Sequence, residues 1–261
     1  MLEIIKKIEY DLYLVLLGVL AFLSYIGILG QLLLPIYIVF GIIIIYKKKS
    51  VLYLVPTAVF LQMGTTGLRD DVKITTIYSI LFLVLIIIDI IKNRKLHKLG
   101  KLFIPLSILV GCSLITIFNA PDTFTWFAGL TQAVSVLALY LYFVNTIDDE
   151  TDNYIKVSKI FMYAGMLVTI EMVHFILHYD AEIIYVIQRR LIDLGWENLN
   201  IVIYSNILSI PLIGYLVLKS KIKLPYMIFA AINVVGILLT LSRSSILTLG
   251  VMIILLVPLI F

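Results

Sequence analysis

The sequence predicts an all-α, polytopic integral membrane protein of about ten transmembrane helices, and three observations carry that prediction. Hydrophobic residues make up 62% of the 261 residues, charged residues only 14%, and the mean hydropathy is +1.12. A soluble globular domain is about half apolar and about a quarter charged. The apolar residues also form long continuous runs, which is typical of membrane helices rather than of alternating strands.

The boundaries of the apolar runs give the expected spans. In chain order these lie at about 12–29, 31–46, 51–67, 73–91, 102–119, 126–144, 158–178, 200–218, 224–241 and 245–261. A turn at Gly30, the motif GLRDD and the motif NAPDTF separate the first three pairs, and charged stretches separate one pair from the next. No small-residue cleavage site follows the first run, so we interpret it as an uncleaved span. We expect a single transmembrane domain over 1–261.

The basic residues orient these spans. With the N-terminus in the cytoplasm, the inner segments hold 15 of the 20 lysine and arginine residues. Membrane proteins keep lysine and arginine on the cytoplasmic side, so we expect a cytoplasmic N-terminus. The net charge of +4 therefore reflects membrane topology, and we expect membrane lipids rather than nucleic acid as partners.

Lysine and arginine are divided between the two sides. Fourteen of the fifteen lysines lie on the predicted inner side, whereas four of the five arginines lie on the outer side, at Arg69, Arg189, Arg190 and Arg243. A planar guanidinium binds phosphate or carboxylate through two parallel hydrogen bonds. We therefore expect an anionic partner at the outer surface, such as a lipid-linked phosphate or pyrophosphate. The alternative is that these arginines are incidental.

The outer loop at 179–199 is expected to contain a short helix lying along the membrane interface. Apolar residues recur there at helical spacing, at Ile183, Ile187, Leu191 and Leu194, and Gly195 would end the helix. Arg190 falls on this apolar stripe, whereas Arg189 is expected to form an ion pair with Asp193. Arg190 is thus the stronger functional candidate, unless its side chain only reaches lipid headgroups.

Ionisable residues also occur inside the predicted spans. Glu171, His174 and His178 share one helical face, which could line a cavity. A metal site would need matching ligands from a second helix, and the remaining histidine, His97, lies on the inner side, so we expect neither a metal nor a cofactor. Asp89 is expected to extend toward the cytoplasmic surface. Cys112 is the single cysteine, which excludes a disulfide framework.

The last two spans are connected at a Ser-Arg sequence. The chain has no charged residue from Leu224 to Ser242 or from Ser244 to Phe261. One continuous helix over both runs would be about 57 Å long, nearly twice a bilayer core of about 30 Å. The chain must therefore turn near Arg243, and we expect a helical hairpin over 224–261.

This hairpin sequence, LLTLSRSSILTLGVMIILLV, resembles the signature of the O-antigen ligase and O-antigen polymerase superfamily, in which a Thr-x-Ser-Arg turn joins two apolar helices. A weaker similarity is the order of Arg190, Gly195 and Asn200. The resemblance implies metal-independent, inverting glycosyl transfer at the outer face of the bacterial cytoplasmic membrane. The donor would be a glycan linked to undecaprenyl pyrophosphate.

The resemblance also implies roles for individual residues. Arg243 and Arg190 would be catalytic, because they would neutralise charge on the departing lipid pyrophosphate. Residues expected to bind the substrate are Arg189, Arg69, Ser242, Asn200 and His178.

One departure from the family concerns the end of the chain. Members of the family continue into a large outer loop that carries a catalytic histidine, whereas this sequence ends at Phe261. We therefore expect a C-terminal portion to be missing and the chain alone to bind the lipid carrier weakly without catalysing. The alternative functions are a transporter or flippase of lipid-linked oligosaccharide, or an inert membrane scaffold. A flippase should carry basic residues at mid-depth in its spans.

Overall fold

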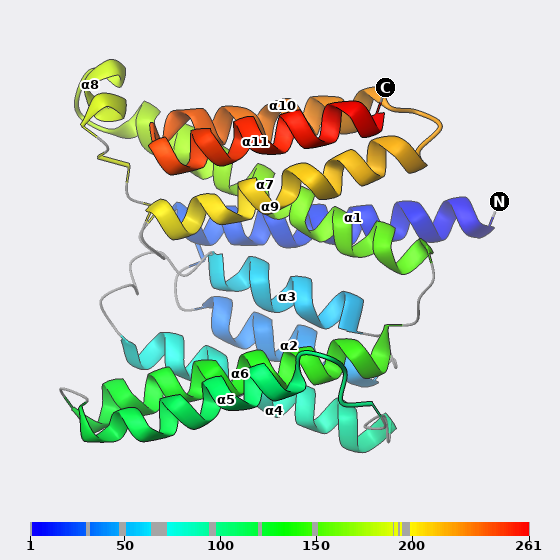
Figure 1. Ribbon diagram of the computed structural model, residues 1–261, viewed down its shortest axis with the longest axis vertical. Helices are drawn as coiled ribbons and strands as arrows, with labels where there is room; N and C mark the ends of the chain where they lie inside the picture. The colour runs from blue at the N-terminus through cyan, green and yellow to red at the C-terminus, as the bar shows by residue number, and fades with distance from the viewer. Residues whose placement is uncertain are drawn as a thin grey trace. The chain divides into compact units, whose positions relative to one another are not determined.

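The computed structural model is helical, and the residues that it describes include no strand (Figure 1). The described residues are 2–29, 32–46, 51–63, 72–93, 98–119, 122–147, 151–189, 191–192, 194 and 199–260.

Each of the ten predicted apolar segments contains a helix. In the first half of the chain these are α1 (Leu2–Tyr25), α2 (Leu33–Tyr46), α3 (Val51–Met63), α4 (Val72–Asn93), α5 (Phe103–Ile115) with the 3-10 turn η2 (Thr116–Phe118), and α6 (Thr123–Thr146). In the second half they are α7 (Thr151–His178), the short α8 (Ile183–Gln188), α9 (Leu199–Lys219), α10 (Leu224–Leu239) and α11 (Arg243–Ile260). The all-α prediction is confirmed for the described residues.

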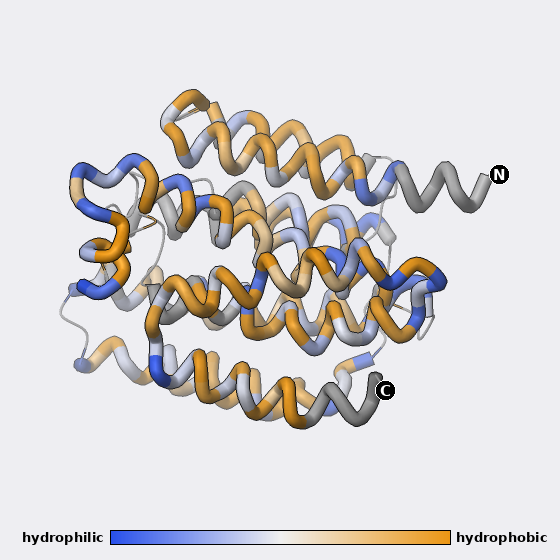
Figure 2. Tube along the Cα trace, turned by 90° about the horizontal axis from the view of Figure 1, so that it is seen from above, coloured by the Kyte–Doolittle hydropathy of each residue, from blue (hydrophilic) through white to orange (hydrophobic). Residues whose placement is uncertain are grey.

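Two helical stretches in the described part of the chain are long and apolar enough to cross a membrane: Trp126–Asn145, within α6, and Thr151–His178, which is α7. Four shorter apolar stretches accompany them: Phe103–Phe118, Ser205–Lys219, Leu224–Leu239 and Arg243–Ile254. Figure 2 shows apolar residues along the helices and polar residues gathered at helix ends and connections.

The chain divides into two compact units. Unit 1 comprises Met1–Gly30, Met63–Thr66 and Tyr154–Phe261, and unit 2 comprises Gln31–Gln62 and Gly67–Asn153. Each unit is built from segments that alternate along the sequence with segments of the other unit. The hydropathy pattern contains no boundary that separates two such units, so the sequence predicts a single domain.

Unit 2 is organised around α6, against which both α4 and α5 pack, while α2 packs against α4. Asp89 on α4 is buried, and its Oδ2 atom accepts a hydrogen bond from the hydroxyl of Tyr142 on α6. The expectation that Asp89 extends to the cytoplasmic surface is therefore wrong. The physical reason is that a buried carboxylate needs a hydrogen-bond donor, and α6 supplies one inside the unit.

The loop before α5 is tied to α6 by side chains. The amide of Asn145 forms two 2.7 Å hydrogen bonds with the backbone of Lys98: its Nδ2 donates to the carbonyl, and its Oδ1 accepts from the amide. The Leu102 amide donates to the Tyr140 hydroxyl at 2.9 Å. Gly100 lies between these contacts with φ +71°, and a Cβ placed on it would lie 2.1 Å from the Tyr140 hydroxyl oxygen.

Replacing Gly100 with alanine is expected to lower the free energy of unfolding by about 1–3 kcal/mol. The alanine would be strained at positive φ and would displace the Tyr140 hydroxyl from Leu102. Thermal unfolding in detergent micelles measures the effect. Gly111→Ala on α5 is the matched control, because a Cβ there meets nothing within 4 Å. Equal stability of the two variants would contradict the strain argument.

Unit 1 contains α1 and α7 to α11. α9 packs against both α10 and α11, and Figure 1 shows α10 and α11 running antiparallel as a hairpin. Near the start of α7, an apolar cluster joins that helix to α9, with Met162, Ile213, Leu216 and Val217 buried in it. Next to this cluster on α7, the ammonium of Lys159 lies 2.7 Å from a carboxylate oxygen of Asp11 on α1.

Candidate functional site

The connection between α10 and α11 turns within three residues, as the sequence predicted. α10 ends at Leu239, and the hydroxyl of the buried Thr240 donates to the Ile237 carbonyl at 2.7 Å. Leu241 has φ +46°, a left-handed conformation that is uncommon for a residue with a side chain. The short turn therefore holds strained backbone two residues before Arg243, a feature that occurs preferentially at functional sites.

Ser242 is buried and forms part of the turn itself. Its amide donates to the Thr240 hydroxyl at 3.3 Å, and its carbonyl accepts from the Ile246 amide at 3.0 Å, which begins α11. The hydroxyls of Ser242 and Ser244 lie 3.1 Å apart. These contacts fix the direction of α11 and the position of the residue that opens it.

Arg243 is the first residue of α11, and its side chain is exposed. Among the described residues it has no ion-pair or hydrogen-bond partner. The free amides and the dipole at a helix N-terminus favour an anion there, as does the guanidinium. An exposed arginine at this position can bind a phosphate group without first breaking an internal ion pair.

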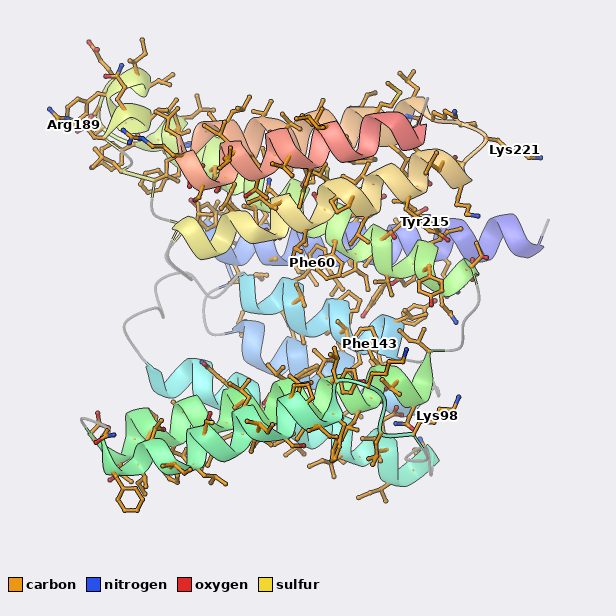
Figure 3. The ribbon with its side chains drawn as sticks, in the orientation of Figure 1. Phe60, Lys98, Phe143, Arg189, Tyr215 and Lys221 are labelled. Atoms are coloured by element: carbon orange, nitrogen blue, oxygen red, sulfur yellow. The ribbon has the colours of Figure 1, made fainter. Side chains whose placement is uncertain are left out.

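A second arginine lies at the same end of unit 1. Arg189 follows α8, is exposed, and has its guanidinium carbon 5.8 Å from the centre of the Tyr185 ring. Figure 3 shows Arg189 and Lys221 at opposite ends of the helices of unit 1. α8 and the α10–α11 turn lie at the same end in both Figure 1 and Figure 2. Within unit 1, Arg189 therefore lies near the α10–α11 turn and Lys221 lies at the opposite end.

The helix predicted for the segment 179–199 is shorter than expected. α8 ends at Gln188, and the Leu191 amide donates to the Val186 carbonyl at 3.0 Å, a bond spacing typical of a Schellman helix end. The prediction that Leu191 and Leu194 continue the apolar face of this helix is therefore wrong. Burial explains the difference: Val186, Ile192 and Leu194 are buried, whereas Ile183 is about half exposed.

The histidine face of α7 packs against α1. Glu171 is fully buried, and the ring of His174 meets those of Phe22 and Tyr25 edge-on at centroid distances of 5.5 and 5.6 Å. His178 is exposed and stacks on His174 at 4.0 Å. Its Nδ1 lies 2.9 Å from the His174 carbonyl. Because a carbonyl only accepts, Nδ1 carries a proton, which leaves Nε2 as a proton acceptor in the neutral ring.

Several predicted site residues cannot be placed in this site. Arg190 and Arg69 lie outside the described residues, as does Asp193, the expected partner of Arg189. Asn200 lies in the first turn of α9, and its side chain is not among those described. The structure thus brings Arg243, Ser242, Arg189 and His178 to one end of unit 1. Among the described residues, no three His, Cys, Asp or Glu side chains group as metal ligands.

The sequence reasoning missed a polar network that joins three helices inside unit 1. Asn206 Nδ2 on α9 donates to the Thr169 hydroxyl on α7 at 2.8 Å and to the Asn233 carbonyl on α10 at 3.3 Å. The Ser209 hydroxyl lies 2.8 Å from Asn233 Oδ1 and 2.7 Å from the Asn206 carbonyl oxygen. All four side chains are buried.

Two glycines let the three helices approach closely at this network. A Cβ on Gly165 of α7 would lie 1.9 Å from Asn233 Oδ1, and a Cβ on Gly236 of α10 would lie 2.3 Å from the Thr169 hydroxyl oxygen. Small residues and side-chain hydrogen bonds are the usual means by which helices associate in a membrane. The sequence signal was present, since Asn206 and Asn233 interrupt otherwise apolar segments.

Comparison with protein-family models, with curated proteins and with solved structures finds no match to this chain.

Proposed function

We propose that the chain is a multi-pass protein of the bacterial cytoplasmic membrane, with about ten transmembrane helices and a cytoplasmic N-terminus. The support is the distribution of polarity. Large apolar side chains are exposed along most helices, among them Leu12, Ile88, Ile108, Leu208, Met227 and Leu247. Polar side chains such as Asn206 and Asn233 are buried and hydrogen-bonded. Soluble monomers rarely expose such extensive apolar surface.

We further propose that unit 1 takes part in glycosyl transfer during surface-polysaccharide assembly, on a glycan carried by a polyprenyl pyrophosphate at the outer membrane surface. The single observation that carries the proposal is Arg243: it is exposed and free of internal partners among the described residues, and it opens an apolar helix after a strained turn. The Ser-Arg turn also carries the sequence resemblance. Arg189 adds a second cation at the same end.

The proposed chemistry is a displacement at the anomeric carbon of the donor sugar. A hydroxyl of the acceptor attacks that carbon, a new glycosidic bond forms, and the bond to the pyrophosphate oxygen breaks. The hydroxyl proton passes to a base, and negative charge develops on the leaving pyrophosphate. Arg243, with Arg190 and Arg189, neutralises that charge, while Ser242 fixes the position of Arg243. A fixed cation aimed at developing charge contributes a large rate effect in a water-poor site.

Replacing Arg243 with alanine is expected to reduce polymerisation or ligation by about 10²- to 10³-fold, the usual effect of removing one group that stabilises developing charge. Arg243→Lys should recover only part of the rate, because an ammonium lacks the paired donors of a guanidinium. Polysaccharide length in the native host, normalised to the amount of protein in the membrane, is the measurement. Lys221→Ala is the matched control, since Lys221 is exposed at the other end of unit 1.

Unchanged polymer in the Arg243→Ala strain would remove Arg243 from the mechanism. The transporter alternative makes a different prediction for a strain that lacks the gene: lipid-linked oligosaccharide would accumulate on the inner leaflet. Under glycosyl transfer it accumulates on the outer leaflet. The buried Lys159 does not favour transport, because its ammonium is already engaged by Asp11 at 2.7 Å and so is not free to escort a phosphate.

A further inference from the structure

Most of α6 is unburied. Only 22% of the apolar stretch within the candidate membrane span Trp126–Asn145 is buried. α4 and α5 pack against other parts of this helix, through Tyr142 and through Trp126, whose indole donates to the Ser113 carbonyl at 2.9 Å. A stripe of exposed residues remains, with Gly129, Gln132 and Val136 at spacings of three and four.

Gln132 is a polar residue on a stripe that otherwise consists of glycine and valine. It is exposed and lies about 4 Å from the midpoint of α6, at 1.5 Å per residue, so it would lie near the centre of a bilayer. A glutamine side chain is too short to reach an interface about 15 Å away. Neighbouring Thr131 and Ser135 donate to carbonyls of α6 itself at 2.8 Å, whereas Gln132 has no hydrogen-bond partner among the described residues.

We propose that the stripe of Gly129, Gln132 and Val136 is the interface between two copies of this chain. A carboxamide both donates and accepts, so two Gln132 side chains related by a two-fold axis can exchange a pair of hydrogen bonds. This pairing removes the free-energy cost of leaving the two carboxamides without hydrogen bonds in lipid. A Cβ on Gly129, about one turn away, would meet nothing within 4 Å, so a second backbone can approach there.

The inference depends on the proposed passage of α6 through the membrane, and it is independent of glycosyl transfer. The test measures the dimer fraction of the full chain in liposomes by energy transfer between labelled copies. Gln132→Leu is expected to raise the dimer dissociation constant by about 5- to 30-fold, since interhelical hydrogen bonds in membranes contribute about 1–2 kcal/mol. Ser135→Ala is the matched control and should leave the dimer unchanged, because the Ser135 hydroxyl bonds within its own helix.

Disulfide cross-linking tests the face itself. In a Cys112→Ala background, Val136→Cys should cross-link between copies, whereas Phe127→Cys should not. Both positions are exposed, at 47% and 43%, but they are nine residues apart and thus on opposite sides of the helix. A monomer at all concentrations, or equal cross-linking at both positions, would overturn the dimer. Failure of α6 to be protected by lipid would instead overturn the membrane assignment.

Discussion

Replacing Gly236 with alanine is expected to destabilise unit 1 by about 3–5 kcal/mol, although it adds only one methyl group. A Cβ at this position would lie 2.3 Å from the Thr169 hydroxyl oxygen and 2.4 Å from Asn206 Nδ2. Those two atoms are hydrogen-bonded to each other at 2.8 Å. The methyl group must therefore either separate α10 from α7 and α9 or break a buried hydrogen bond. Overpacking costs about 1–3 kcal/mol, and a stranded polar group adds about 1–3 kcal/mol.

Gly250 on α11 provides the matched control, because it lies in the same unit and a Cβ there meets nothing within 4 Å. Gly250→Ala is expected to be neutral or to stabilise by up to about 1 kcal/mol through helix propensity. Thermal unfolding of both variants in the same detergent gives the comparison. If Gly236→Ala unfolds at the temperature of Gly250→Ala, the close packing of the three helices is not as described.

The positions of the helices were predictable because they depend on local composition. Each of the ten apolar segments became a helix, and the turn between α10 and α11 lies between two uncharged runs that are together too long for one crossing of a bilayer. Pro225, in the first turn of α10, is also in the place where proline is compatible with a helix. Hydropathy and spacing fix these features without reference to any other helix.

The pairing of helices was not predictable in the same way. Asn206 bonds to Thr169, 37 residues earlier, and to Asn233, 27 residues later. Asp89 bonds to Tyr142, 53 residues later. A polar residue in an apolar segment indicates that a partner exists, but which residue is the partner depends on helix packing, which the local pattern does not contain.

The candidate site was predictable in part for the same reason. The exposed Arg243 at the turn follows from chain length and charge alone. The position at which α8 ends does not follow from the sequence pattern. Burial of Ile192 and Leu194 in the tertiary structure overrides the helical spacing of the apolar residues around Arg189. Tertiary burial and helical periodicity therefore conflict just after α8, and burial determines the structure of the described residues there.

A second large loss of stability is expected when the ion pair between α1 and α7 is broken. Lys159 Nζ lies 2.7 Å from Asp11 Oδ2, and the two side chains differ in exposure, at 8% for Lys159 and 35% for Asp11. A buried pair of this kind holds two helices together only while both charges are present. The difference in exposure makes the two single substitutions unequal, since an orphaned Asp11 is nearer to water than an orphaned Lys159, although the Oδ1 atom of Asp11 is itself buried.

Asp11→Leu is therefore expected to cost about 3–5 kcal/mol, the usual result of leaving a buried charge without its partner. Lys159→Met should cost less, about 1–2 kcal/mol, because partial hydration screens the remaining carboxylate. The double variant Asp11→Leu/Lys159→Met should recover to within about 1 kcal/mol of the parent, since apolar pairs often replace buried ion pairs without loss. Unfolding free energies of the four proteins form a double-mutant cycle. Additive losses would show that the ion pair does not couple α1 to α7, and a milder effect for Asp11→Leu than for Lys159→Met would contradict the argument from exposure.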